Sequence, residues 1–166
     1  HGMKPKHHAD GSPNVVYIQD VMDEWLGEAV ARVILPITDP YVVHHGALGS
    51  FATMYLPADT DRQDIIDRLA KIDGIEFVCG REEACGRFGL PADRIGDIVL
   101  TSGANITIGT SEHRHDLAAL KDPLRSHGGL HEQTVPFIVN RKLELDSAPD
   151  LRNFDAFFYA TKAAAL

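Results

Sequence analysis

The sequence predicts an α/β fold, in which strands and helices alternate along the chain. Two observations support this class. Segments with apolar residues at helical spacing alternate with short apolar runs of strand length, and Gly, Pro or Asp stands between most of them. The chain has 166 residues, 44% of them hydrophobic and 24% charged, which is typical of a globular protein with a sizeable core.

The first elements expected are a loop, a helix and a strand. Residues 1–14 are polar and rich in His, Gly and Pro, as loops are. Residues 15–26 place apolar side chains at helical spacing, and Gly27 is a suitable residue for ending that helix. Residues 32–37 form a short apolar run, which predicts a buried strand, and residues 38–40 (TDP) predict a turn after it.

The middle of the chain predicts a hairpin and a well-defined helix. Residues 41–56 are rich in β-branched and aromatic residues around two glycines, which favours a hairpin. Residues 59–72 predict a helix with Asp61 as its N-cap and Gly74 after its end. The apolar face of this helix consists of Ile65, Ile66, Leu69 and Ile72.

The later elements follow from the same signals. Residues 113–131 carry four His and predict a loop rather than a regular element. The other predicted elements are strands at 75–78, 97–101, 105–108 and 135–139, a helix at 82–88 that ends at Gly89, and a terminal helix at 154–165.

Composition excludes two classes of partner. The net charge is -8 and there is no basic stripe, which argues against nucleic acid as a partner. No apolar run approaches the length of about 20 residues that a membrane helix needs. The two cysteines, Cys79 and Cys85, have no zinc-type spacing, so we expect reduced thiols and a cytoplasmic protein.

The motif Ser126-His127-Gly128-Gly129 is a candidate metal-binding turn. Neutral imidazole is a common ligand for zinc, and small neighbours let the backbone fold tightly and let a substrate approach. The alternative is a turn with an incidental surface His. His131 could be a second ligand, but the favoured expectation for its side chain is solvent exposure.

The opening residues His1-Gly2-Met3 are a second candidate. An imidazole followed by Gly can lie at the carboxyl edge of a strand, which is where open α/β sheets bind ligands. Because His, Gly and Met are also common in cloning tags, a tag remnant is the alternative interpretation of these three residues.

Two other His-containing segments are weaker candidates. His44 and His45 are adjacent, so in a regular strand only one of them can face a given site. The segment 112–116 (EHRHD) resembles a metal site in composition, with a solvated charged loop as the alternative. A phosphate-binding loop with Lys and Ser/Thr, and a GxSxG nucleophile motif, are both absent from the sequence.

Two segments together resemble the alkaline phosphatase superfamily, whose members are metal-dependent hydrolases of phosphate, phosphonate and sulfate esters. HGMKPK at residues 1–6 resembles the end of an Asp-His-Gly-Met motif, and SHGGLHEQTVPFIVN at residues 126–140 resembles the late His-Gly segment. Within the superfamily, residues 1–25 and 126–140 look most like the phosphonoacetate hydrolases. The resemblance covers essentially the whole chain and is specific at these two segments.

The resemblance implies a sheet sandwiched by helices, an inserted α+β cap and a site with two zinc ions. His1 matches a ligand of the first zinc and His127 a ligand of the second. The Asp that precedes the His in the motif and the Thr nucleophile have no counterpart here, so we expect no catalytic residue in this chain. We expect it to be a C-terminal portion, with weak or no native zinc binding and no turnover alone, because catalytic zinc takes about three protein ligands.

The resemblance also implies an organisation and a reaction. Residues 1–29 and 113–166 match the core, and residues 30–112 match the cap. The complete enzyme is expected to hydrolyse the C–P bond of phosphonoacetate, a small anionic phosphonate, to acetate and phosphate. The expected partners are the missing N-terminal portion and a possible second copy in a homo-oligomer. Candidates for contact with the substrate carboxylate, on chemistry alone, are Lys4, Arg114 and the His44–His45 strand.

Two alternative functions remain at this point. The motifs hold metal ions and do not choose the leaving group, so a phosphodiesterase or phosphomonoesterase of the same superfamily is one alternative. A non-catalytic α/β module that binds an anion or a protein is the other.

Overall fold

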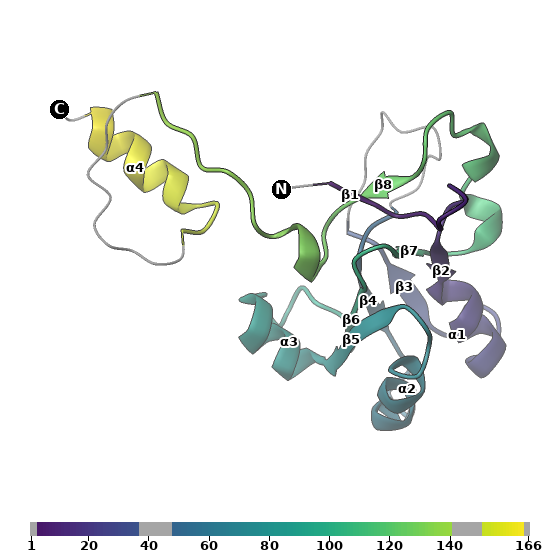
Figure 1. The fold of residues 1–166 in the computed structure, drawn as a ribbon. Coiled ribbons are helices and arrows are strands. Elements are labelled where there is room, and N and C mark those ends of the chain that lie inside the picture. The colour runs from purple at the N-terminus through teal and green to yellow at the C-terminus, as the bar shows by residue number, and fades with distance from the viewer. Residues whose placement is uncertain (1–2, 37–47, 141–150, 165–166) are drawn as a thin grey trace. The chain divides into compact units, whose positions relative to one another are not determined.

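A four-stranded antiparallel sheet forms the centre of the fold in the computed structural model (Figure 1). The structure describes residues 3–36, 48–140 and 151–164, and the side chains up to residue 162. The strands follow the order β3-β4-β6-β5 across the sheet. Their bounds are Arg32–Ile34 for β3, Phe51–Tyr55 for β4, Ile98–Ser102 for β6 and Ile75–Gly80 for β5.

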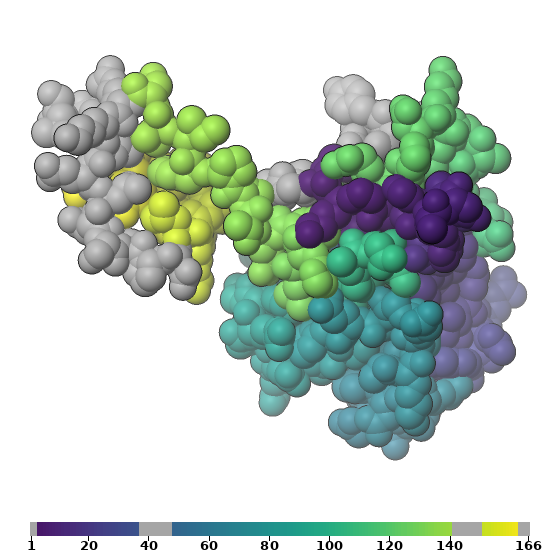
Figure 2. Space-filling view, in the orientation of Figure 1, coloured from purple at the N-terminus to yellow at the C-terminus, as the bar shows by residue number. Residues whose placement is uncertain are grey.

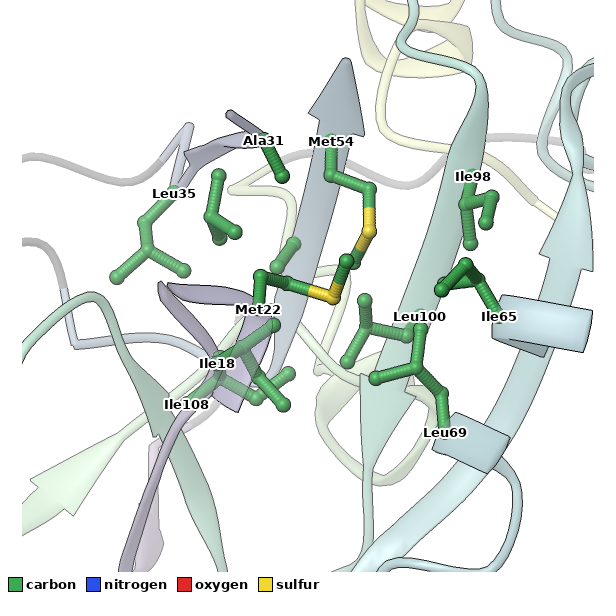
Figure 3. Packing of buried hydrophobic residues seen from close by; sticks show 12 residues of the cluster. Ile18, Met22, Ala31, Leu35, Met54, Ile65, Leu69, Ile98, Leu100 and Ile108 are labelled. Carbon is green, nitrogen blue, oxygen red and sulfur yellow. The ribbon is translucent and has the colours of Figure 1, made fainter. Parts of the chain in front are cut away.

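Helices cover both faces of this sheet. Ile98 and Leu100 of β6 join one apolar cluster with residues of α1 (Ile18–Leu26) and α2 (Arg62–Leu69) (Figure 3). Val99, between them, joins a second cluster with Ala84 of α3 (Arg81–Phe88). Successive side chains of a strand point to opposite faces, so β6 is buried along its whole length. The predicted α/β class is confirmed.

Two further pairs of strands form separate two-stranded sheets, in addition to the four-stranded one. β2 (Val15–Tyr17) pairs in parallel with β7 (Thr107–Gly109). β1 (Lys4–Pro5) pairs antiparallel with β8 (Arg125–Ser126), so the purple N-terminal segment lies beside the green segment that contains β8 (Figure 2). Three short 3-10 helices complete the elements, at Glu112–Arg114 (η1), Leu117–Ala119 (η2) and Leu130–Glu132 (η3).

The chain divides into two compact units, His1–Val135 and Pro136–Leu166. The first unit contains all the strands named above. The second contains α4 (Asp155–Ala164), where Tyr159 is buried and its ring stands edge-on to the rings of Phe137 and Phe158. The predicted division into a core and a cap at residues 30–112 stays a prediction. In the described parts of the chain, no helix is long and apolar enough to cross a membrane.

Several predicted elements are confirmed with their caps. The Asp61 carboxylate accepts hydrogen bonds from the backbone N–H groups of Gln63 and Asp64, at 3.0 and 3.2 Å, and so caps α2. α3 ends at Gly89, whose φ of +64° is a left-handed conformation that Gly adopts easily. The predicted terminal helix corresponds to α4.

Other predictions were wrong at their ends or entirely. The first helix begins at Ile18, because Val15–Tyr17 pair with β7 and a strand partner overrides helical spacing. Residues 135–139 form no strand, and Ile138 is 86% exposed. Within the described residues these apolar side chains have no partner strand, and an apolar run alone does not make a sheet. The turn at 38–40 and the first arm of the predicted hairpin lie outside the described residues, and β4 corresponds to its second arm.

The two cysteines are both free and should differ in reactivity. Cys79 is buried in the sheet and Cys85 is partly exposed on α3. Burial, assisted by the nearby Glu83 carboxylate, raises the pKa of the Cys79 thiol to about 11. The reactive form of a thiol is the thiolate, so Cys79 is both shielded and protonated at neutral pH.

We expect a chromogenic thiol reagent at neutral pH to modify Cys85 quickly and Cys79 only after the protein is unfolded with denaturant. The Cys85→Ser variant removes only the partly exposed thiol. It should lose the fast reaction of the folded protein and keep the reaction that appears after unfolding. Fast modification of both thiols in the folded protein would contradict the burial of Cys79.

Candidate functional site

The β1–β8 ladder brings the two predicted motif segments together. Lys4 pairs with Ser126 and Pro5 with Arg125. Lys4 directly follows the His1-Gly2-Met3 segment, and Ser126 directly precedes His127. Two segments more than a hundred residues apart in sequence therefore lie side by side. His1 itself lies outside the described residues, so its predicted position as a metal ligand is not tested.

His127 stands at the start of a tight turn directly after β8. Its side chain is half-buried, and its backbone carbonyl accepts a hydrogen bond from the Ser50 N–H at 2.9 Å. The hydroxyl of Ser126 donates to the Leu48 carbonyl from a buried position. Gly128 has a φ of +96°, in the left-handed region that favours Gly. The backbone before and after the imidazole is thus set by specific bonds.

Gly129 allows the turn to pack closely against the segment that leads into β4. A Cβ atom at this position would lie 2.6 Å from the Ser50 Cβ and 3.0 Å from the Glu132 Oε2. Both distances are shorter than ordinary van der Waals contact. The expectation that small residues let the backbone fold tightly here is confirmed.

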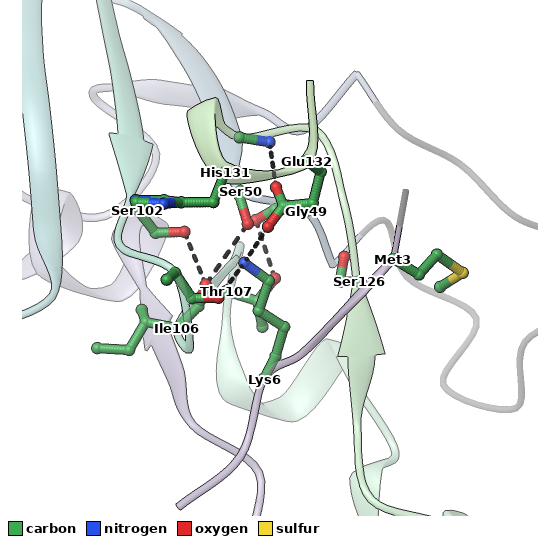
Figure 4. Close-up of polar contacts among 12 residues, drawn as sticks. Met3, Lys6, Gly49, Ser50, Ser102, Ile106, Thr107, Ser126, His131 and Glu132 are labelled. Carbon is green, nitrogen blue, oxygen red and sulfur yellow. Dashed lines mark hydrogen bonds and ion pairs between the residues drawn. The ribbon is translucent and has the colours of Figure 1, made fainter. Parts of the chain in front are cut away.

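A buried ion pair lies beneath this turn (Figure 4). The Lys6 Nζ donates to the Glu132 Oε1 at 3.0 Å and to the Ala104 carbonyl at 2.9 Å. The Glu132 Oε2 accepts the backbone N–H of Gly129 at 2.8 Å. Lys6 is 0% and Glu132 3% exposed. Burial lowers the pKa of the Lys6 ammonium, and its hydrogen bond to the Glu132 carboxylate acts in the opposite direction.

Lys6 and Glu132 were not among the residues predicted from the sequence. The sequence did contain a signal for Glu132. An acidic residue three positions after the start of a helical turn can accept a hydrogen bond from the first backbone N–H of that turn. In η3, Glu132 accepts the N–H of Gly129 in this way. Lys6 had no such signal. Its neighbour Lys4 is exposed, and nothing in a polar N-terminal segment distinguishes a buried Lys from an exposed one.

His131 lies in η3, on the same turn as His127, and contacts a carboxylate of the four-stranded sheet. Its Nε2 lies 2.7 Å from the Glu76 Oε2 of β5, and both side chains are about one-third exposed. Exposed pairs of this kind contribute little to stability, about 0–1 kcal/mol. The contact nevertheless joins η3 to the four-stranded sheet.

The side chains of segment 112–116 differ in burial and do not converge on one site. The His115 Nε2 accepts a hydrogen bond from the Thr110 N–H at 3.0 Å, and its ring stacks on Tyr17 with centroids 6.0 Å apart. His115 is buried, whereas His113 and Arg114 are exposed. The Lys4 side chain is exposed as well. His44 and His45 lie outside the described residues.

A zinc ion requires more ligands than the described residues bring together. Among the described residues, no three or more His, Cys, Asp or Glu side chains are grouped closely enough to hold a metal ion. A catalytic zinc takes about three protein ligands. The half-buried His127 fits the role of one ligand, and the described residues do not by themselves make up a zinc site.

The packing at Gly129 gives a direct prediction. Gly129→Ala should lower the free energy of unfolding by about 1–3 kcal/mol, because the added methyl group overpacks against Ser50. Gly86→Ala is the matched control, since a Cβ at Gly86 in α3 meets nothing within 4 Å. That change should be neutral or stabilising, because Ala favours helix more than Gly does. Equal stability of the two variants in denaturant unfolding would contradict the close packing.

The chain is similar in sequence and in fold to proteins of known structure. No family model matches the sequence. Two crystal structures of phosphonoacetate hydrolase from Sinorhizobium meliloti 1021 are similar to the chain, one in complex with phosphonoformate and one with phosphonoacetate. Each shows 74% sequence identity over 99% of this chain, with a TM-score of 0.88.

The chain spans 40% of the length of each of those solved chains. Phosphonoacetate hydrolase is an enzyme of the alkaline phosphatase superfamily, in agreement with the predicted fold class and with the resemblance of the two motif segments. Over the part that it spans, the chain therefore belongs to the phosphonoacetate hydrolase family.

Proposed function

We propose that the full-length protein carrying these residues hydrolyses the carbon–phosphorus bond of phosphonoacetate to acetate and phosphate. The observation that carries the proposal is the 74% identity, over 99% of the chain, to an enzyme solved with phosphonoacetate bound. The second ligand seen in that enzyme, phosphonoformate, also combines a phosphonate with a carboxylate. A small substrate with both anionic groups accounts for both complexes.

The reaction makes clear demands on a site. In the net reaction, a water oxygen replaces the carbon on phosphorus, the C–P bond breaks, and the departing carbon takes up a proton to give acetate. Negative charge on the phosphonate oxygens and on the leaving group must be stabilised in the transition state. A chain with a net charge of -8 therefore needs local positive charge at the site.

We propose that two zinc ions supply this positive charge beside the phosphonate oxygens, with His1 as a ligand of one and His127 as a ligand of the other. Support comes from the β1–β8 ladder, which places the segment after His1 next to the residue before His127. Two metal ions that act on one phosphoryl group lie about 4 Å apart, so their ligands must converge in this way.

The remaining ligands, the Thr nucleophile and the residues that contact substrate are proposed to lie in the part of the family's length that this chain does not span. The parallel pair β2–β7 is consistent with this, because parallel strands usually belong to larger sheets with both faces covered. We also propose that residues 30–112 form a cap over the site.

The proposal predicts a metal-dependent reaction with a specific requirement for His127. The full-length protein should release phosphate from phosphonoacetate, and a strong chelator should abolish the release until zinc is returned. His127→Ala should lower kcat/KM by a factor of about 100 or more, because it removes a metal ligand. His113→Ala is the matched control at an exposed imidazole and should keep the activity.

Release of phosphate from a phosphate monoester or diester, but not from phosphonoacetate, would move the assignment to a phosphoesterase of the same superfamily. Full activity of His127→Ala would contradict the metal-binding role. The 166-residue chain alone is expected to release no phosphate, since it carries one proposed ligand for each zinc ion.

A further inference from the structure

The Glu132 carboxylate joins two segments that meet at His127. Its Oε1 lies 3.0 Å from the Lys6 Nζ, and its Oε2 accepts the Gly129 N–H at 2.8 Å. Lys6 and Glu132 are 0% and 3% exposed. Groups buried to this degree cannot contact a substrate from solvent, so any effect of this pair on a reaction passes through its neighbours.

The neighbours of the pair are the backbone atoms that surround the imidazole. The Gly129 N–H is held by Glu132, and the His127 carbonyl is held by the Ser50 N–H at 2.9 Å. These two bonds fix the turn on both sides of Gly128. Lys6 follows β1 directly and also donates to the Ala104 carbonyl, at 2.9 Å. The same pair therefore holds the N-terminal segment and the His127 turn in one arrangement (Figure 4).

Stability alone does not account for an ion pair at this position. Moving two charges out of water is costly, and replacing such a pair with apolar residues of similar volume is often neutral or stabilising. Groups that orient a metal ligand, in contrast, strongly affect metal affinity, because a small displacement of the ligand weakens its bond. Glu132 holds the backbone N–H of Gly129, which is two residues after His127. This location fits the second role.

We propose that Lys6 and Glu132 are positioning residues, which hold the His127 turn against the N-terminal segment so that the imidazole has the orientation its metal ion requires. This inference rests on the proposed function, in which His127 is a metal ligand. It adds two residues to the machinery of the site that neither contact substrate nor bind metal.

The test uses the full-length protein and the double variant Lys6→Met/Glu132→Leu, which keeps the buried volume and removes both charges. The first readout is the zinc dissociation constant, measured by competition with a chromogenic chelator, and the second is the thermal unfolding midpoint. We expect a dissociation constant raised by a factor of about 10–100, with cooperative unfolding retained. Glu76→Gln is the matched control, because it alters the exposed contact to His131 on the same turn and should leave zinc affinity unchanged.

A folded double variant with the zinc affinity of the parent protein would overturn the inference. If the double variant does not fold, Glu132→Gln replaces it, because the amide has one acceptor oxygen for the two donors of Lys6 and Gly129. This variant should also bind zinc more weakly, and unchanged affinity would overturn the inference equally.

The variant His127→Ala separates this inference from the function on which it rests. If His127→Ala leaves zinc affinity unchanged, the proposed role of His127 fails. If His127→Ala weakens zinc binding and the variants at Lys6 and Glu132 do not, only the positioning role fails.

Discussion

The buried contact between Lys6 and Glu132 joins parts of the chain that are distant in sequence and that together frame the candidate site. It bonds the segment after β1 to the turn after β8, and through Ala104 it also reaches the loop before β7. Both charges lie in the interior, so neither can lose its partner without a large penalty, of about 3–5 kcal/mol for such pairs. The contact therefore makes other arrangements of these segments unfavourable.

The apolar core and this polar contact have different roles. Helices on both faces of the four-stranded sheet bury the side chains of β6 completely, and burial of this kind supplies most of the free energy of folding. Hydrophobic packing is tolerant of rearrangement, because it has no preferred direction. The hydrogen-bonded turn at His127 depends on direction as well as distance, which is what a ligand for a metal ion requires.

Local signals in the sequence predicted the elements whose cause is local. α2 has its capping Asp61, α3 has its terminal Gly89, and α4 has helical spacing, and all three were predicted. Prediction failed where a distant partner decides the structure. Val15–Tyr17 became a strand because β7 lies beside them, and residues 135–139 formed none because the described residues offer no partner strand.

The candidate site shows the same division. His127 and its glycines were recognised because the motif is contiguous, and the tight packing at Gly129 confirms the reason given for those small residues. Lys6 was missed because its contact with Glu132 spans 126 positions and leaves no local pattern, whereas Glu132 had a local signal in its spacing from Gly129 that the predictions did not use. The two segments resembled one superfamily before the structure showed that β1 and β8 pair, and the pairing gives that resemblance a physical basis.

The most direct test of the account is a crystal structure of the full-length protein grown with zinc, with anomalous diffraction recorded on both sides of the zinc absorption edge. The account predicts a zinc peak with a nitrogen of the His127 imidazole about 2.0–2.1 Å away, and the Lys6–Glu132 contact intact beneath it. A zinc peak held by other residues, with the His127 imidazole turned away from it, would contradict the account.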